Sequence, residues 1–246
     1  MPTDTPSAGR RIRWDRWLLA LYVASVIVIA IQKGFFTPDN NFAIFRASFG
    51  NLVAGRDLYA PHPDQYLDLY KYSPTFAVLF APIAILPLPL GILVWSAVNA
   101  LLLYYAVRRL LPDEEGNRQA TLALALMYFD VLRATQRAQS NSLVTALVIL
   151  AFIALERRRQ GAAALSMGVG ALVKIFPLAA VPLAIFHPRR VRFAAIFVAV
   201  MAGLIALPLL FVPPHELLAQ YASWRRLEAV DAVVRAGTTG AGVYGG

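Results

Sequence analysis

Long apolar runs separated by short polar segments dominate the pattern of this chain. The runs cover residues 17–31, 88–107, 119–132, 143–155, 161–186 and 193–212. A helix that crosses a membrane needs about 17–25 mostly apolar residues at a rise of about 1.5 Å per residue. The pattern therefore predicts an all-α fold, a polytopic membrane helical bundle.

The run at 161–186 has two interpretations. One continuous helix of this length would extend ~39 Å and cross the membrane once. Two short helices that break near Lys174 would form a hairpin instead. We favour the hairpin because it leaves the basic residues before and after the run on the same side of the membrane. With it, the chain has about seven membrane segments.

Composition and charge support a membrane protein. Hydrophobic residues make up 59% of the 246 residues, charged residues 15%, and cysteine is absent. These values exclude a disordered chain, a disulfide-stabilised secreted module and a Cys-ligated metal site. The net charge of +9 suggests nucleic-acid binding, but more than half of the 23 Lys and Arg residues lie in four clusters beside apolar runs, at 10–16, 108–118, 157–159 and 189–192. Such clusters stay cytoplasmic, so no nucleic-acid partner is predicted.

This charge pattern orients the chain in its membrane, which we expect to be the plasma membrane. Residues 1–16 form a cytoplasmic N-terminal tail and residues 17–212 the membrane domain. Residues 33–87 form a large outer loop, and residues 213–246 form an outer-side segment with a Gly-rich end and no closing element, as in a truncated chain. The expected partners of such a protein include membrane lipid.

The outer loop contains two predicted interfacial helices. Five apolar residues of the first share one arc of about 100°, which predicts a helix lying flat on the membrane: Phe42, Phe45, Phe49, Leu52 and Val53. Tyr66, Tyr70 and Tyr72 are expected at the level of the membrane interface. Residues 74–86 are apolar but too few to span, so we expect a second interfacial or half-inserted helix.

Charged and amide side chains gather on the predicted outer side, where each is a candidate for function. The main candidates are Asp39, Asp68, Lys71, Gln139, Asn141 and Lys174. Carboxylates and cations beside a membrane suit a substrate that carries both a phosphate and a nucleophilic hydroxyl. The cations would hold the phosphate and a carboxylate would accept the proton.

Each candidate also has a structural alternative. One residue of 39–41 can cap the helix that follows, and Lys71 can extend past neighbouring tyrosines to water. Gln139 and Asn141 can cap the returning helix, and Lys174 can pair with a carboxylate. The histidines lack a paired ligand spacing, so no metal site and no cofactor is predicted.

An ordered set of short motifs resembles glycosyltransferase family 87. The motifs are Asn41-Phe42, Gly55-Arg56-Asp57-Leu58-Tyr59, Tyr70-Lys71-Tyr72-Ser73-Pro74-Thr75-Phe76, Trp95, Gln139-Ser140-Asn141 and Lys174-Ile175-Phe176-Pro177. The resemblance implies a GT-C fold and transfer of mannose or a similar sugar, with inversion, from a polyprenyl phosphate donor to a lipid or glycan acceptor. It also implies an outer-face active site.

The same resemblance implies an acid directly before the phenylalanine that opens the outer helix, where this chain has Asn41. Asn cannot act as a general base, so Asp39 is the first catalytic candidate and Asp68 the second. The expected substrate-binding residues are Asn41, Lys71, Tyr72, Gln139, Asn141 and Lys174. Two other functions remain open: a transporter or flippase for the lipid-linked sugar, and a noncatalytic membrane subunit.

Overall fold

The computed structural model describes residues 14–37, 39–174, 177–178 and 189–241. Regular structure within these ranges is helical, without strands, which confirms the all-α prediction. The elements are α1 (Trp14–Ile31), the π-helix η1 (Gln32–Phe36), α2 (Asn40–Val53), α3 (Pro74–Ala84), α4 (Leu88–Leu110), α5 (Glu114–Gln136), α6 (Asn141–Glu156), α7 (Gln160–Val173), α8 (Arg190–Ala206), the 3-10 helix η3 (Leu207–Leu210) and α9 (Pro214–Ala241).

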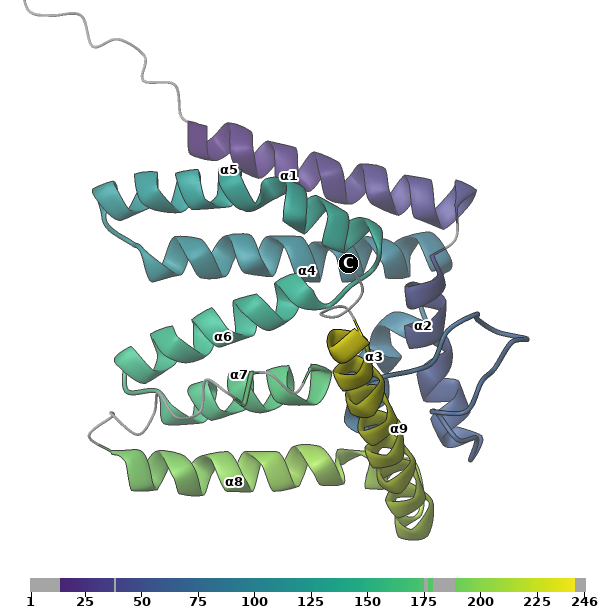
Figure 1. Cartoon of the computed structure of the whole chain (residues 1–246). Coiled ribbons are helices and arrows are strands. Elements are labelled where there is room, and N and C mark those ends of the chain that lie inside the picture. Colours follow the sequence, from purple (N-terminus) through teal and green to yellow (C-terminus); the bar gives the residue numbers. More distant parts are fainter. Residues whose placement is uncertain (1–13, 38, 175–176, 179–188, 242–246) are drawn as a thin grey trace, which may run out of the picture.

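The long helices form a layer with similar axis directions. Helices α1 and α5 lie beside α4, and α6, α7 and α8 follow in that order (Figure 1). Helices α2, α3 and α9 cross one end of this layer, which we call the loop end (Figure 1). The arrangement brings chain segments far apart in the sequence to the loop end.

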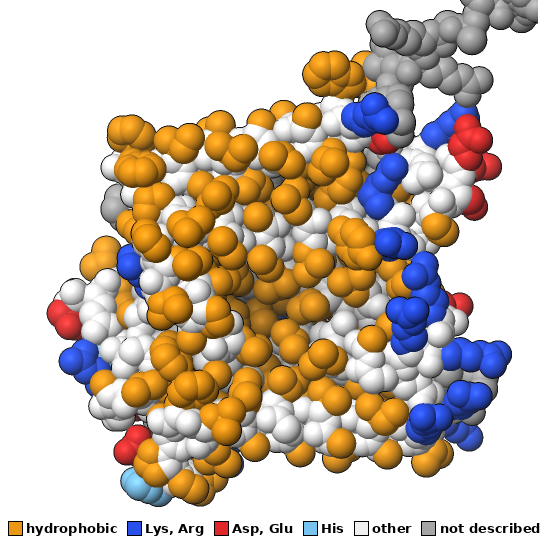
Figure 2. Space-filling view, turned by 180° about the vertical axis from the view of Figure 1, so that it is seen from behind, with side chains coloured by type: hydrophobic (Ala, Val, Ile, Leu, Met, Phe, Trp, Pro, Cys, Tyr) orange, Lys and Arg blue, Asp and Glu red, His pale blue; other side chains and the backbone are white. Residues whose placement is uncertain are grey.

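The opposite end of the layer carries the basic clusters, and we call it the basic end. Arg108 and Arg109 close α4, Arg157–Arg159 separate α6 from α7, and Arg189 and Arg190 begin α8. Figure 2 shows Lys and Arg side chains along one edge of a face that is otherwise largely hydrophobic. The first cluster is described only in part, since residues 10–13 lie outside the described ranges.

Three helical segments in the described ranges are long and apolar enough to cross a membrane: Trp14–Phe36, Leu88–Leu110 and Arg190–Leu210. Shorter apolar helices are α3, α6 and α7. Large apolar side chains point outward on several helices, with Val28, Phe129 and Val198 at 61%, 75% and 66% exposure. An apolar outer surface is what a lipid environment requires. The count of about seven segments stays a prediction.

The run at 161–186 is not one continuous helix. Helix α7 begins at the basic end and stops at Val173, and α8 begins again at the basic end with Arg190. Both neighbouring basic clusters therefore lie at the same end, as the hairpin interpretation requires. The second limb of that hairpin falls on residues 175–176 and 179–188, outside the described ranges.

The predicted flat helix packs differently from the expectation. Phe42, Phe45 and Leu52 are each at most 2% exposed, because α2 turns this face to α3 and to Trp95 of α4. Within the arc only Val53 is open, at 49%. Tyr66 and Tyr70 were expected at the membrane interface and are also buried in the core. The apolar arc is real, but protein covers it rather than lipid.

No helix was predicted in the segment after residue 212, where the structure forms one. Residues Pro214–Ala241 form α9. Gln220 of α9 accepts a hydrogen bond from the Leu58 amide at 3.1 Å and donates to the Arg56 carbonyl at 2.8 Å. Ser223 donates to the Asp57 carboxylate at 3.0 Å. Helix α9 thus holds the turn at 56–58, and Asp57 has a structural role.

Candidate functional site

An aromatic cluster fixes α2, α3 and α4 relative to one another. The Phe45 ring lies 5.2 Å from Phe76 and 5.6 Å from Trp95, and Phe80 lies 5.2 Å from Trp95, all measured between ring centroids. Edge-to-face pairs of this kind contribute about 0.5–1.5 kcal/mol each beyond their burial. The cluster provides a rigid floor for the loops at the loop end.

The turn between α5 and α6 rests on this floor. The Trp95 indole donates to the Ala138 carbonyl at 2.9 Å, and the Asn41 amide donates to the Arg137 carbonyl at 2.8 Å. Ala138 has a φ of 48°, a left-handed conformation that is costly for a residue with a Cβ. Asn99 of α4 accepts from the Leu143 amide at 3.2 Å. These bonds hold a strained turn in one conformation.

The turn presents two amide side chains to a lysine. The Lys174 ammonium donates to the Asn141 side-chain oxygen, and the Asn141 amide donates to Gln139 at 3.0 Å. Burial lowers the pKa of Lys174, because a partly desolvated ammonium is harder to keep charged. The lysine and both amides therefore form one polar chain at the loop end. Among the described residues Lys174 bonds to an amide, whereas the structural alternative for this lysine was a pair with a carboxylate.

The loop before α3 closes the other side of this group. The Ser73 hydroxyl donates to the Leu172 carbonyl at 2.6 Å, which joins the loop to the last turn of α7 beside Lys174. Burial raises the pKa of the Tyr72 phenol, and the adjacent Ser140 side chain opposes that rise. The Tyr72 side chain therefore lies next to the turn that carries Gln139 and Asn141. Ser140 of this turn is fully buried, and its hydroxyl has no hydrogen-bond partner within the described part of the chain.

Asp39 begins α2 as its N-cap. Its side chain accepts from the Phe42 amide at 3.2 Å, and its second oxygen lies 3.8 Å from the Lys33 ammonium. The capping interpretation is therefore correct for this residue. Asp39 also lines a cavity of about 310 Å³ together with Arg46 and Gln65. A carboxylate that caps a helix with one oxygen can still present the other to a ligand.

Asp68 and Lys71 lie in the loop between α2 and α3. Both are exposed, and the Asp68 carboxylate accepts from the Leu69 amide at 2.7 Å. The Leu67 amide donates to Asn40 at 2.8 Å, so this loop runs beside the first turn of α2. No three His, Asp or Glu side chains of the described ranges meet as a possible metal site.

The family model for glycosyltransferase family 87 matches residues 70–241, more than half of the chain. This chain belongs to glycosyltransferase family 87. No curated protein and no solved structure gives a significant match. The family 87 match includes Lys71, Tyr72 and the polar chain of Lys174, and it begins after Asp39, Asn41 and Asp68. The assignment of Asp39 and Asp68 as candidate catalytic carboxylates therefore rests on geometry and not on the family match.

Two residues of this candidate site, Arg46 and Asn99, were missed from the sequence. Arg46 reaches the cavity beside Asp39, and its guanidinium donates to the Ala84 carbonyl at 3.3 Å. Asn99 is buried behind the turn. Asn99 had a signal that could have found it, since an amide inside an apolar helix needs a partner. Arg46 gave no such signal, because exposed arginines are ordinary at helix surfaces.

Proposed function

We propose that this family 87 glycosyltransferase moves a hexose, mannose or a similar sugar, from a polyprenyl phosphate to a lipid or glycan acceptor at the outer face of the plasma membrane. The observation that carries the proposal is the Lys174–Asn141–Gln139 chain of side chains at the end opposite the basic clusters. Basic flanks favour the cytoplasmic side, so the loop end would face outward.

The roles of the residues follow from their chemistry. Lys174 and Lys71 hold the donor phosphate, because ammonium groups form charge-assisted hydrogen bonds with phosphate oxygens. Gln139 and Asn141 bind sugar hydroxyls or phosphate oxygens as amide donors and acceptors. Tyr72 forms the wall next to them. No metal is needed in this scheme, since the lysines balance the charge of the departing phosphate.

The reaction needs one proton acceptor. The Asp39 carboxylate takes the acceptor hydroxyl proton while the oxygen bonds to the anomeric carbon, and the bond from that carbon to the phosphate oxygen breaks. Polyprenyl phosphate leaves as an anion, and the anomeric configuration inverts. We favour Asp39 over Asp68 because Asp39 lines a cavity with Arg46 and Gln65. In this scheme Asn41 has a positioning role, because its hydrogen bond to the Arg137 carbonyl holds the turn that carries Gln139.

Transfer from a radiolabelled polyprenyl-phosphate sugar tests the proposal in membranes that contain the full chain. Lys174→Ala should abolish transfer while membrane insertion stays intact, and Arg157→Ala, an exposed cation at the basic end, should leave transfer unchanged. Asp39→Asn should abolish transfer and Asp68→Asn should not. Normal transfer by Lys174→Ala would refute the role of this lysine. Label movement across the membrane without transfer would indicate a carrier, and neither activity would indicate a noncatalytic subunit.

A further inference from the structure

The turn between α6 and α7 carries an arginine in a backbone conformation that favours glycine. The Arg159 amide donates to the Ala154 carbonyl at 2.8 Å, and this bond closes the end of α6. The Arg158 amide donates to the Leu155 carbonyl at 2.9 Å. Together the two bonds form a Schellman motif, in which the left-handed residue is usually glycine. Arg158 takes that place with a φ of 57°, which is costly for a residue with a Cβ. The chain therefore places a positive charge here against the preference of the backbone.

A second pair of arginines lies beside this turn. Gln160, the first residue of α7, is buried, and its side-chain amide donates to the Arg189 carbonyl at 3.2 Å. Met167 of α7 and Phe193 of α8 belong to one buried cluster, which keeps the two helices together. Four exposed arginines flank the bonded pair, two directly before Gln160 and two shortly after Arg189. We call them the arginine cluster: Arg158, Arg159, Arg190 and Arg192.

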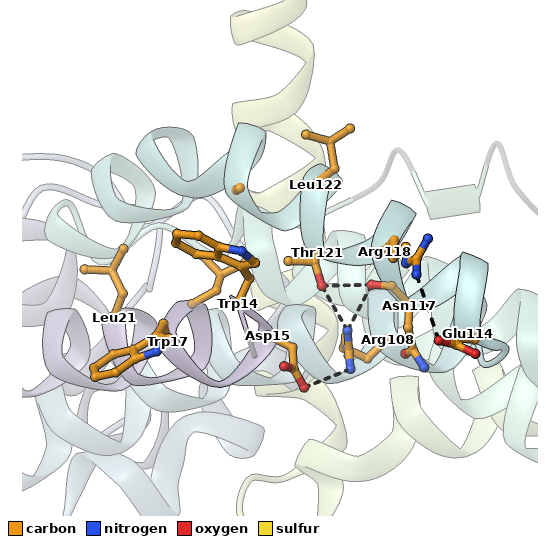
Figure 3. A pocket seen from close by; sticks show the side chains of 12 residues that line it. Trp14, Asp15, Trp17, Leu21, Arg108, Glu114, Asn117, Arg118, Thr121 and Leu122 are labelled. Atoms are coloured by element: carbon orange, nitrogen blue, oxygen red, sulfur yellow. Dashed lines mark hydrogen bonds and ion pairs between the residues drawn. The ribbon is translucent and has the colours of Figure 1, made fainter. Parts of the chain in front are cut away.

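Nearby acids do not balance the charge of the arginine cluster. Residues 156–159 and 189–192 contain six arginines and one acid, Glu156. Among the ion pairs of the described ranges, none includes a residue of the cluster. The groove between the starts of α1 and α5, at the same end, differs because its Arg118 lies 4.0 Å from the Glu114 carboxylate (Figure 3). The arginine cluster therefore attracts an anion that the described residues do not supply.

The surface next to the arginine cluster is apolar and faces outward. Helix α8 is part of a segment that is long and apolar enough to cross a membrane, and its Val191 and Val198 are exposed, as is Leu165 of α7. Figure 2 shows basic side chains along the edge of such a hydrophobic face. When acyl chains cover the apolar face, this edge lies at the level of the lipid phosphates. An acidic protein would match the charge but not the apolar wall, so the occupant that fits both is a lipid.

We propose that the arginine cluster binds a phospholipid whose headgroup carries a phosphate and no amine, the chemistry of phosphatidylglycerol. Guanidinium groups donate paired, charge-assisted hydrogen bonds to phosphate oxygens. Basic sites between membrane helices are a common place for anionic headgroups. An ethanolamine or choline headgroup would bring a further positive charge among the four arginines, which disfavours it. The acyl chains follow the exposed apolar side chains of α8.

Native mass spectrometry of the purified full chain in an uncharged detergent tests this proposal. Lipids with identical acyl chains and a glycerol, ethanolamine or choline headgroup are titrated separately. Phosphatidylglycerol should be retained about tenfold more tightly than the other two, as expected for two or three partly exposed charge contacts. Inorganic phosphate at the same concentration should not displace it, because it lacks the acyl chains. Equal retention of the three lipids, or displacement by inorganic phosphate, would overturn the proposal.

Matched double variants assign the binding to the arginine cluster. Arg190→Gln combined with Arg192→Gln removes two of its charges and should lower the preference for phosphatidylglycerol about fivefold. Arg109→Gln combined with Arg118→Gln removes two exposed charges from the same end and should leave the preference unchanged. The Arg118 guanidinium faces Glu114, and Arg109 lies over the Tyr105 ring. An equal loss in both double variants, or no loss in the first, would overturn the assignment.

Arg158 allows the effects of charge and of backbone conformation to be separated. Arg158→Gly and Arg158→Gln both remove the guanidinium, so each should lower the preference for phosphatidylglycerol about threefold. Only Arg158→Gly relieves the left-handed conformation, so without lipid it should unfold at a higher temperature than Arg158→Gln. Loss of binding in the more stable variant then has no origin in misfolding. Full preference in both variants would overturn the proposal. No sugar donor or acceptor is present, so the result does not depend on sugar transfer.

Discussion

Asn40 and Asn41 offer a test of the site in which one chemical change has two opposite expected effects. Both residues stand in the first turn of α2. Asn40 uses its side-chain oxygen, as acceptor from the Leu67 amide at 2.8 Å. Asn41 uses its nitrogen, as donor to the Arg137 carbonyl at 2.8 Å. Replacing either by Asp keeps the size and the oxygen acceptors but removes the N–H donors.

The size of the effect follows from these bonds. A carboxylate in the first turn of a helix gains about 0.3–1 kcal/mol from the helix dipole, and this gain is common to both variants. Asn40→Asp keeps its hydrogen bond. Asn41→Asp loses one, worth about 0.5–1.5 kcal/mol, and turns a negative oxygen toward the Arg137 carbonyl. The free energy of unfolding of Asn41→Asp should therefore lie about 1–2 kcal/mol below that of Asn40→Asp.

Thermal unfolding in detergent measures this difference. Each kcal/mol corresponds to about 2–4 °C in a chain of this size, so Asn41→Asp should unfold several degrees below Asn40→Asp. Its sugar transfer should also fall, because the turn with Gln139 and Asn141 loses a support. Equal midpoints would refute the assigned role of the Asn41 amide. Faster transfer by Asn41→Asp would show that a carboxylate at this position serves as the base and that Asp39 does not.

Three further predictions concern the lysine, the floor and α9. Burial lowers the pKa of Lys174 below its ordinary 10.5, so this lysine loses its charge at a lower pH than an exposed lysine does. Sugar transfer should therefore decline as the pH rises through the lowered pKa of Lys174. Lys174→Arg should move that decline to higher pH in a pH–rate profile, because arginine stays charged. Trp95→Phe leaves the Ala138 carbonyl without its donor and should cost about 1–3 kcal/mol in thermal unfolding, and an unchanged midpoint would contradict this. Gln220→Leu removes both bonds to the backbone at 56–58, so hydrogen exchange there should accelerate while exchange in α4 stays the same.

Local sequence determined the class of this protein. Apolar runs and basic flanks predicted helices in a membrane with one basic end, and the described helices agree in type. The predicted ends of the helices were less accurate. Helix α5 begins at Glu114 and not at the predicted residue 119, because Asp113 caps it ahead of the apolar run. The sequence also singled out Lys174, Gln139 and Asn141, since polar groups beside apolar helices require partners.

Only the tertiary structure decided how these pieces meet. Asn41 and Arg137 are separated by 96 residues, and no local pattern shows that one holds the other. The apolar arc of α2 had two possible covers, lipid or protein, and the sequence pattern is the same for both. In the structure this arc packs against α3 and α4, so protein covers it. Periodicity fixes which face of a helix is apolar, but what covers that face depends on contacts between distant segments.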